Sequence, residues 1–369
     1  MKKDNAVVFS ADALAVKDAS QTYSFVVVGD LGAGSIGQKR IAQAVYKAKP
    51  DFVVMPGDLT YNFGRLSEYF TRFFPVYNSD SAASDAGVPL MRSTLCMPVL
   101  GNHDIAVTGS NTPTDLNTYP DALAYFLVWS SPLNGPLGET HTANRPMITG
   151  DVQRLSAFRA AAESRYPRMA NYSFDYANSH WLVLDANYYM DWSDKTLRKW
   201  VETDLNNAKG AKWRFVTFHQ PSFSADEAHF KEQRMRVLCN LFESKGVDIV
   251  FAGHAHNYQR TYPLRFRVRD TSRMIADGTV SGDIALDHSF DDSAKTKPKG
   301  IIYIVTGAGG AKLYKPVSTD KMNWLGNFIK KLNADVHSYT MCKVNGATLS
   351  LQQISDRGEV LDQFTLSKD

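Results

Sequence analysis

Apolar runs that end abruptly in short polar motifs constrain the fold of this chain more than any other feature. The runs 25–28 and 52–55 are apolar at every position, as in central strands of a parallel sheet that is covered by helices on both faces. Between them, Ile41, Val45 and Ala48 share one face of an expected helix. The pattern predicts a β-α-β unit, and such sheets gather ligands beyond the carboxyl ends of their strands.

Five motifs of this kind follow expected strands, and all of them carry side chains that can bind a metal. They are Gly29-Asp30-Leu31-Gly32, Gly57-Asp58-Leu59-Thr60-Tyr61, Gly101-Asn102-His103-Asp104, Phe218-His219-Gln220-Pro221 and Gly253-His254-Ala255-His256. We expect them to converge at one edge of a sheet. Asp, Asn and His suit Fe, Mn or Zn, and the absence of Cys from every motif argues against a soft metal or an iron-sulfur cluster.

The five motifs differ in how strongly each one indicates a metal. An Asp after a strand often caps a turn, and alternate histidines such as His254 and His256 can point to opposite sides of an extended chain. An amide beside an imidazole, as in Asn102-His103, is less common at a strand end. Taken together, the motifs predict two ions about 4 Å apart that share one bridging carboxylate. Asp58 is the expected bridge.

These motifs resemble those of the metallophosphoesterase superfamily and, more narrowly, of the purple acid phosphatases. Tyr61 carries the narrower resemblance, because the purple acid phosphatase pattern is Gly-Asp-x-x-Tyr. A phenol with an ordinary pKa near 10 ionises readily only beside a strong Lewis acid, which indicates a trivalent ion. The resemblance covers roughly residues 23 to 310. It implies an acid phosphatase in which a metal-bound hydroxide attacks a phosphate monoester.

The resemblance also implies a ligand set for each ion. Fe(III) would be held by Asp30, Asp58, Tyr61 and His256. A divalent Fe, Zn or Mn would be held by Asp58, Asn102, His219 and His254.

Three further residues receive catalytic roles from the same resemblance. His103 would bind phosphate or protonate the leaving oxygen, with Asp104 orienting its ring. His229 fits a family histidine that lies nine or ten residues after the ligand equivalent to His219 and helps to bind the phosphoryl group. Glu227 is a weaker candidate for sharing that role.

The expected architecture is an α/β fold of the metallophosphoesterase type, a four-layer α/β/β/α sandwich of two mixed β-sheets flanked by helices. We expect a single domain over 1–369, with a core at about 22–366, an N-terminal extension at 1–21 and a solvated insertion at 265–299. The segment before Tyr23 is too short for the extra β-sandwich domain of large plant enzymes, so the chain resembles the small single-domain type.

Other expectations concern local structure. Helices are expected at 151–166, at 229–245, and after Ser193 as an N-cap, while Asn345-Gly346 predicts a hairpin turn. The segment 105–150 is expected to form a wall of the site.

Composition excludes some classes of protein and partner. A net charge of +3, without a block of like charges, gives no nucleic-acid footprint. No apolar stretch reaches the roughly 18 residues of a membrane span, and no signal peptide is visible. The family resemblance implies a small phosphate ester as the partner and a secreted or lysosome-like location. The sequence leaves the oligomeric state open.

Two other functions remain open from the sequence. A phosphodiesterase or nucleotide hydrolase can use the same dinuclear core with different pocket walls. A non-catalytic binding protein on this fold is the third interpretation, and the retention of all seven ligands together with His103 disfavours it.

Overall fold

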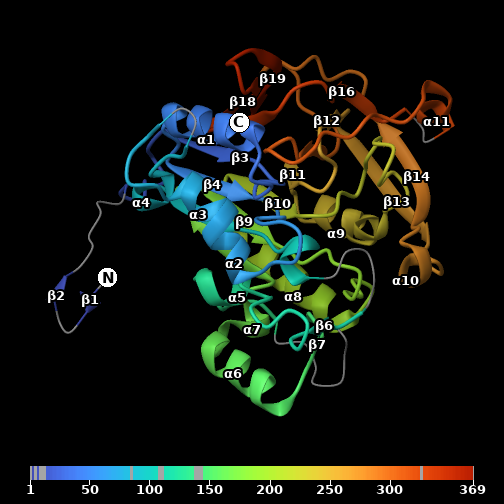
Figure 1. Ribbon diagram of the computed structural model, residues 1–369. Helices are drawn as coiled ribbons and strands as arrows, with labels where there is room; N and C mark the ends of the chain where they lie inside the picture. Colours follow the sequence, from blue (N-terminus) through green and yellow to red (C-terminus); the bar gives the residue numbers. More distant parts are fainter. Residues whose placement is uncertain are drawn as a thin grey trace.

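The computed structural model describes residues 2–3, 6–7, 14–83, 86–106, 112–136, 144–324 and 327–368, without the side chains of 2–3, 6–7 and 322–324. The expected extension at 1–21 and the expected wall at 105–150 thus lie partly outside the described residues. Two mixed sheets pack face to face with helices outside them, which confirms the four-layer α/β/β/α sandwich (Figure 1). In the part of the chain that the structure describes, no helix is long and apolar enough to cross a membrane.

The first sheet has six strands and carries the first three motifs. Three parallel strands lie on one side of it and three antiparallel strands from the C-terminal part of the chain lie on the other. In spatial order the strands are β19 (Val360–Ser367), β18 (Thr348–Ser355), β17 (Ser338–Asn345), β3 (Tyr23–Val27), β4 (Phe52–Met55) and β5 (Leu95–Pro98). The expected hairpin turn at Asn345-Gly346 is confirmed, since it joins β17 to β18.

The second sheet has seven strands and carries the two histidine motifs. Strands β9, β10, β11 and β15 are mutually parallel, and antiparallel strands border them on both sides. In spatial order the strands are β16 (Ile329–Asn333), β12 (Tyr258–Thr261), β15 (Ile302–Thr306), β11 (Ile249–Ala252), β10 (Trp213–Phe218), β9 (Ser179–Val183) and β8 (Tyr172–Tyr176).

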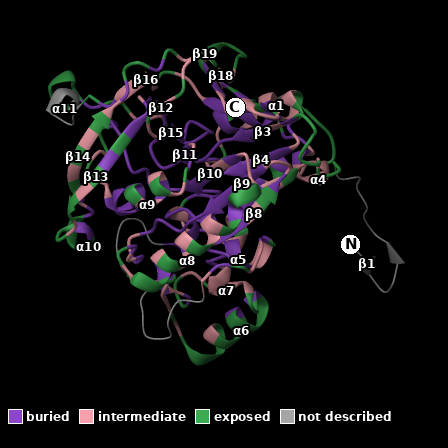
Figure 2. Ribbon diagram, turned by 180° about the vertical axis from the view of Figure 1, so that it is seen from behind, coloured by how far each residue is buried: buried purple, intermediate pink, exposed green. Residues whose placement is uncertain are grey.

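Side-chain alternation along the strands builds the layers. Phe25 and Val27 of β3 point into an aromatic core between the sheets, where Phe25 meets the edge of Trp181 at a centroid distance of 5.0 Å. Val26 points to the outer face, toward the helix α1 (Ile36–Ala48). Helices α8 (Lys195–Asn207) and α9 (Cys239–Ser244) cover the second sheet in the same way, and Figure 2 shows that central strands such as β4 and β11 are buried.

Apart from the eleven-residue α6, the remaining helices and strands are short, and most of them lie in connections. The helices are α2 (Leu66–Glu68), α3 (Phe74–Tyr77), α4 (Leu90–Ser93), α5 (Tyr125–Val128), α6 (Val152–Ala162), α7 (Arg165–Arg168), α10 (Met274–Asp277) and α11 (Thr319–Trp324), with a π-helical turn at Tyr69–Phe73 and 3₁₀ turns at His103–Ile105, Ala208–Gly210 and Arg234–Leu238. The paired short strands are β1 (Lys2–Lys3) with β2 (Ala6–Val7), and β6 (Thr114–Asp115) with β7 (Ile148–Thr149).

Two helix predictions need correction. Asp194, and not Ser193, caps α8, because its carboxylate accepts hydrogen bonds from the backbone N–H groups of Thr196 and Leu197. The expected long helix at 229–245 is a 3₁₀ turn followed by the six-residue α9. Residues 229–233, where that helix was expected to begin, lie instead in the loop that brings His229 to the site.

The segment 265–299 is not the solvated loop that its charges suggest. Strands β13 (Leu264–Asp270) and β14 (Ser281–Leu286) form a hairpin in which Leu264 and Phe266 are buried while Arg265 and Arg267 are exposed. Asp292, later in the segment, pairs with the fully buried Arg260 of β12 at 2.7 Å. The composition of this segment suggests a solvated loop, but apolar residues at alternate positions pack it against the rest of the protein.

His180 on β9 predicts a pH dependence of stability. Its ring nitrogens lie 2.8 Å from Asp204 and 2.8 Å from Asp175. Burial lowers the pKa of His180, but these two carboxylates outweigh burial and the net pKa is raised. A raised pKa in the folded state gives stability that is full below the unfolded pKa of about 6.5 and is lost as pH rises through the folded value.

We therefore expect His180→Gln to lower the free energy of unfolding by an amount on the order of 1 kcal/mol more at pH 5.5 than at pH 9. Urea unfolding at both pH values measures this, with His288→Gln as the control. An equal loss at both pH values would contradict the charged pairing.

Candidate metal centre

The five motifs meet where the carboxyl ends of two sheets come together. Asp30, Asp58 and Asn102 follow β3, β4 and β5 of the first sheet, whereas the three histidines follow β10 and β11 of the second. The expectation of one sheet edge is corrected: the site bridges two sheets. The Gly29 N–H donates to the Thr306 carbonyl at 3.0 Å, which links the end of β3 in the first sheet to the end of β15 in the second.

Tyr61 lies in one half of the cluster, among residues predicted to bind Fe(III). Its hydroxyl oxygen is 3.1 Å from Asp30 Oδ1 and 3.1 Å from His256 Nε2. Asp30 Oδ1 and His256 Nε2 are themselves 3.3 Å apart. Asp58 can join Asp30 and His256 as a third ligand of this half. All of these side chains are buried.

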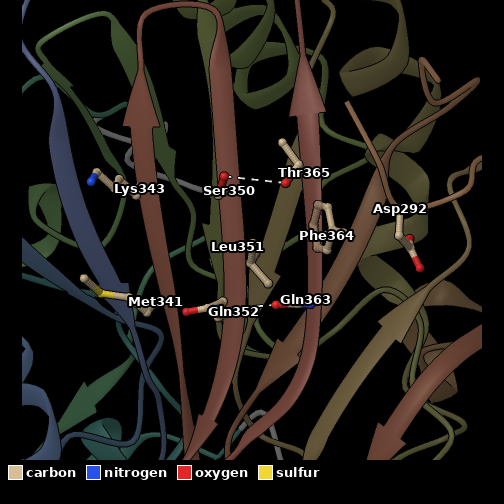
Figure 3. Close-up of a pocket in the computed structure, with 9 residues that line it drawn as sticks. All are labelled: Asp292, Met341, Lys343, Ser350, Leu351, Gln352, Gln363, Phe364 and Thr365. Atoms are coloured by element: carbon tan, nitrogen blue, oxygen red, sulfur yellow. Dashed lines mark hydrogen bonds between the residues drawn. The ribbon is translucent and has the colours of Figure 1, made fainter. Parts of the chain in front are cut away.

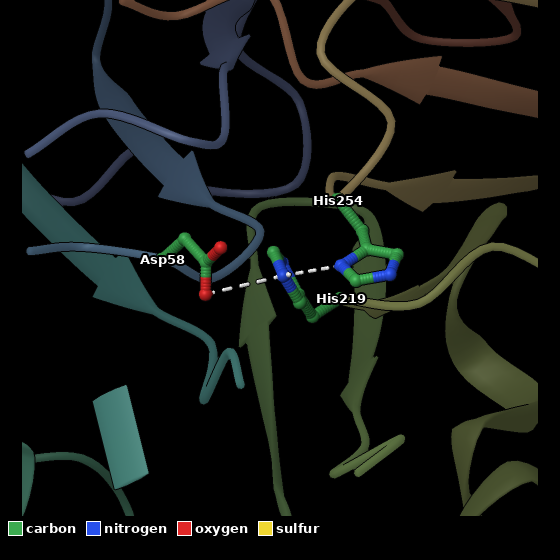
Figure 4. A group of neighbouring side chains, drawn as sticks. All are labelled: Asp58, His219 and His254. Atoms are coloured by element: carbon green, nitrogen blue, oxygen red, sulfur yellow. Dashed lines mark hydrogen bonds and ion pairs between the residues drawn. The ribbon is translucent and has the colours of Figure 1, made fainter. Parts of the chain in front are cut away.

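His219 lies at the centre of the other half. Its Nε2 is 3.0 Å from Asn102 Oδ1, 3.2 Å from Asp58 Oδ1 and 3.2 Å from His254 Nδ1. Figure 4 shows Asp58, His219 and His254 in this arrangement. Asp58 thus belongs to both candidate ligand groups, which fits its predicted bridging role.

The three histidines are oriented by hydrogen bonds on the nitrogen that faces away from the cluster. His219 Nδ1 and His256 Nδ1 each donate to a backbone carbonyl, of Pro56 and of Lys312, at 2.7 Å. His254 Nε2 lies 3.0 Å from the Glu232 carboxylate. Each ring therefore keeps its other nitrogen free for a metal, which is the arrangement found around metal-binding histidines.

Charges within the cluster fit a site built for cations. Burial and then Asp30 and Asp58 raise the pKa of Tyr61 well above its usual 10. Burial opposes ionisation of Asp58, but His219 and His103 outweigh it and hold the pKa of Asp58 below its usual range. The pKa of His219 rises to about 10 because Asp58 and Asp30 overcome the opposing effect of burial. A bound cation would replace the protons that Tyr61 and His219 carry in its absence.

Backbone conformation supports a functional role for the same residues. Asp30, Asp58 and His254 all have positive φ, at 61°, 52° and 69°. Such strained conformations in residues other than glycine cluster at functional sites. Gly101 is required for a different reason, because a Cβ there would overlap the backbone nitrogen and the carboxylate of Asp58.

His103 stands beside the cluster and is partly accessible. Its Nδ1 donates to the Asn62 carbonyl at 2.9 Å, and its Nε2 lies 4.0 Å from Asp58 Oδ2. The expected orienting role of Asp104 is wrong. Asp104 is fully buried and accepts hydrogen bonds from the backbone N–H groups of Leu59 and Gly101, at 3.0 and 2.8 Å. Asp104 therefore joins two motif loops, and Asn62 orients the His103 ring.

Asp104 also carries an unusual pKa. Burial and the charge of Asp58 raise the pKa of Asp104 to about 8. The fixed backbone donors explain why a carboxyl group is kept here, since they give its oxygens partners in a buried position.

His229 lies next to the cluster, as expected. Its ring is 4.0 Å from the ring of His254, and its Nδ1 is 3.2 Å from the buried Asp226 carboxylate. Glu227 is exposed, so the acid that supports His229 is Asp226. Neither Asp226 nor Glu232 was found from the sequence, because neither lies in a strand-end motif.

Tyr314 was also missed. Its ring stacks on that of His256 at a centroid distance of 4.0 Å and an interplanar angle of 10°. It follows Gly307-Ala308-Gly309-Gly310, a stretch that shares the family resemblance, and that position is the one signal in the sequence that points to it.

A separate hollow of about 510 Å³ lies on the outer face of β17, β18 and β19 (Figure 3). Its polar lining is largely paired across the strands, as in Gln352 with Gln363 at 3.4 Å. Asp292, at its rim, already pairs with Arg260 and Lys330. None of the motif residues lines this hollow, so it is distinct from the metal centre.

The fold and the paired ligand clusters define a metallophosphoesterase. A family model described as calcineurin-like phosphoesterase matches residues 23–258, and one described as iron/zinc purple acid phosphatase-like protein C matches 300–363. The chain belongs to the calcineurin-like phosphoesterase family, and the relatives below confirm its resemblance to the purple acid phosphatases.

Three comparisons illustrate that resemblance. Purple acid phosphatase 21 of Arabidopsis thaliana is 28% identical over 65% of this chain and 45% of its own length. The phosphoenolpyruvate phosphatase of Allium cepa is 34% identical over 79% and 49%. A solved purple acid phosphatase from yellow lupin (Lupinus luteus) seeds covers 95% of this chain and 54% of its own, with a TM-score of 0.66 and 18% identity. The chain spans about half the length of these plant relatives, so its resemblance to the small type stays a prediction.

Proposed function

We propose that this protein is an acid phosphatase that hydrolyses small phosphate monoesters at a dinuclear centre of Fe(III) and a divalent Fe, Zn or Mn. The position of the Tyr61 hydroxyl, 3.1 Å from both Asp30 and His256, is the observation that carries this proposal. When bound, such a pair of ions supplies a nucleophilic water of lowered pKa and offsets the charge of the transferred phosphoryl group.

The side chains of the chain itself provide the other requirements. The hydrogen bond from His103 Nδ1 to Asn62 leaves Nε2, 4.0 Å from Asp58, as the nitrogen that faces the substrate position. When His103 is protonated, this nitrogen can donate a proton to the leaving oxygen. The His229 ring lies 4.0 Å from that of His254, and because Asp226 contacts its Nδ1, its Nε2 can bind a phosphoryl oxygen.

The first test measures metal content, the visible spectrum and turnover of the purified protein. We expect iron plus a divalent ion, a visible charge-transfer band, and faster hydrolysis of p-nitrophenyl phosphate than of bis(p-nitrophenyl) phosphate. Preference for the diester would favour a phosphodiesterase. Absence of turnover in protein that holds both ions would favour a binding protein, and colourless protein without iron would overturn the Fe(III) assignment.

His103→Gln is expected to lower kcat for an alkyl phosphate by about 10²- to 10⁴-fold, because a general acid contributes that much when the leaving group is poor. The effect on p-nitrophenyl phosphate should be much smaller, since nitrophenolate leaves without protonation. Steady-state kinetics on both substrates measure this, with His288→Gln as a matched control outside the motifs. Equal losses on both substrates would exclude proton donation by His103.

We also propose that the protein acts outside the cytoplasm, in a secreted or lysosome-like location, as the family resemblance implies. Fractionation of the source cells followed by activity staining would test this. Activity confined to the cytosol would contradict it.

A further inference from the structure

A buried polar network lies behind the loops that carry Asn102 and His219. Its central residue is Asn187, which is fully buried in the segment after β9. The Asn187 amide nitrogen donates to the Gly101 carbonyl at 3.3 Å and to Asp185 Oδ1 at 2.9 Å. On the other side, the Gln220 side-chain amide donates to Asn187 Oδ1 at 3.0 Å. One side chain thus contacts the residue before Asn102 and the residue after His219.

The partners fix the orientation of the Asn187 amide. A carbonyl and a carboxylate can only accept, so the NH₂ group must face Gly101 and Asp185. The carboxylate of Asp185 is held in turn by the Tyr189 hydroxyl at 2.5 Å, and its backbone N–H donates to Asn171 Oδ1 at 2.8 Å. Asn187 is therefore a rigid bridge with a single hydrogen-bonding arrangement.

The two loops that Asn187 joins come from different sheets. Asn102 follows β5 at the edge of the first sheet, and His219 follows β10 inside the second. Their ligand atoms, Asn102 Oδ1 and His219 Nε2, must lie within one coordination sphere and are 3.0 Å apart. A small shift between the sheets would separate these two ligands, and a hydrogen-bonded side chain between their neighbours opposes that shift.

The other half of the centre does not use this bridge. Asp30 and His256 are tied together through the Gly29 to Thr306 hydrogen bond and through the contact of Asp30 Oδ2 with the His254 N–H at 2.9 Å. The Asn187 bridge therefore affects the position of Asn102 and His219 more than that of Asp30 and His256.

We propose that Asn187 is a positioning residue that sets the distance between Asn102 and His219 and thereby the affinity of the divalent-metal position. The proposal rests on the assignment of these two ligands to the divalent ion in the proposed function. Asn187 is not one of the assigned ligands and acts through the Gly101 and Gln220 contacts.

The test is a comparison of metal binding in the full-length iron-loaded protein and in Asn187→Leu, which keeps the approximate volume and removes the hydrogen bonds. Zn²⁺ titration against a competing chelator should show about 10- to 100-fold weaker Zn²⁺ binding, the range seen when a residue that orients a ligand is lost. Iron content and the visible band should stay as in the parent protein. Unchanged Zn²⁺ affinity, or parallel loss of iron and Zn²⁺, would overturn the proposal.

Asn178→Ala is the matched control. Its amide also joins distant segments, accepting from Tyr23 at 3.1 Å and donating to Gly346 at 3.0 Å, but it lies at the opposite end of the strands. We expect Asn178→Ala to lower the free energy of unfolding about as much as Asn187→Leu does, without any change in Zn²⁺ affinity. An equal loss of Zn²⁺ affinity in Asn178→Ala would show a general effect of stability and would contradict positioning by Asn187.

Gln220→Leu gives a second measurement if Asn187→Leu does not fold. It removes one arm of the bridge and should weaken Zn²⁺ binding in the same direction by a smaller factor, and unchanged Zn²⁺ binding there would again overturn the proposal. The outcome is separable from that of the proposed function. Parent protein that binds both ions without phosphatase activity would refute the function while leaving the metal titration of Asn187→Leu decisive.

Discussion

His219→Ala is expected to abolish the divalent-metal position and to lower kcat/KM for a phosphate monoester by at least about 10³-fold. The His219 Nε2 atom lies within 3.2 Å of ligand atoms from Asp58, Asn102 and His254, so its removal leaves the centre of that cluster empty. Loss of metal stabilisation in the transition state amounts to several kcal/mol, and each 1.4 kcal/mol corresponds to about tenfold in rate. Metal analysis and steady-state kinetics measure both effects.

His288→Ala serves as the control for His219→Ala, because it removes a histidine that belongs to none of the five motifs. Circular dichroism at the assay temperature shows that each variant is folded. Retention of two metal ions per chain by folded His219→Ala would contradict the assignment of His219 as a ligand.

Tyr61→Phe is expected to remove the visible charge-transfer band of iron-loaded protein completely. The band requires a phenolate bound to Fe(III), and Phe keeps the ring while deleting the only oxygen that can bind. Burial and the two aspartates raise the pKa of Tyr61, so in the absence of a cation this hydroxyl stays protonated. A coloured parent protein and a colourless Tyr61→Phe variant with equal iron content would establish the bond.

Tyr69→Phe is the matched control for Tyr61→Phe. Tyr69 is also buried and lies eight positions later in the chain, but its hydroxyl accepts a hydrogen bond from the Trp129 indole at 3.0 Å. The band should persist in Tyr69→Phe. A band that survives in Tyr61→Phe would assign the colour to another ligand and would leave Tyr61 as a packing residue.

Much of the fold could be predicted because its signals are local. The strand 52–55 is apolar on both faces, so its burial can be predicted from its own residues. An Asn-Gly pair likewise predicts a hairpin turn without reference to any distant residue. The predictions that were wrong depended on distant contacts. Charges in 265–299 indicated a solvated loop, yet Phe266 packs against Phe223 and Asp292 meets Arg260, contacts that a local pattern does not contain.

The site shows the same division. The family resemblance implied that Asp104 orients the His103 ring, but the Asp104 carboxylate accepts hydrogen bonds from the backbone of Leu59 and Gly101 instead. Glu227, which was expected to share the phosphoryl-binding role of His229, is exposed, whereas the buried carboxylate of its neighbour Asp226 holds the His229 ring.

The sequence by itself determined which side chains can hold two metals, since each motif stands at the end of an apolar strand and that pattern is local. It also singled out Tyr61 as the residue that indicates a trivalent ion. Only the tertiary structure decided that the ligands come from two sheets, that Glu232 contacts His254, that Asp226 holds His229, and that Asn187 joins the loops of Asn102 and His219. The physical reason is that hydrogen bonds such as those of Asn187 join residues 86 and 33 positions apart, where no periodicity in the chain can record them.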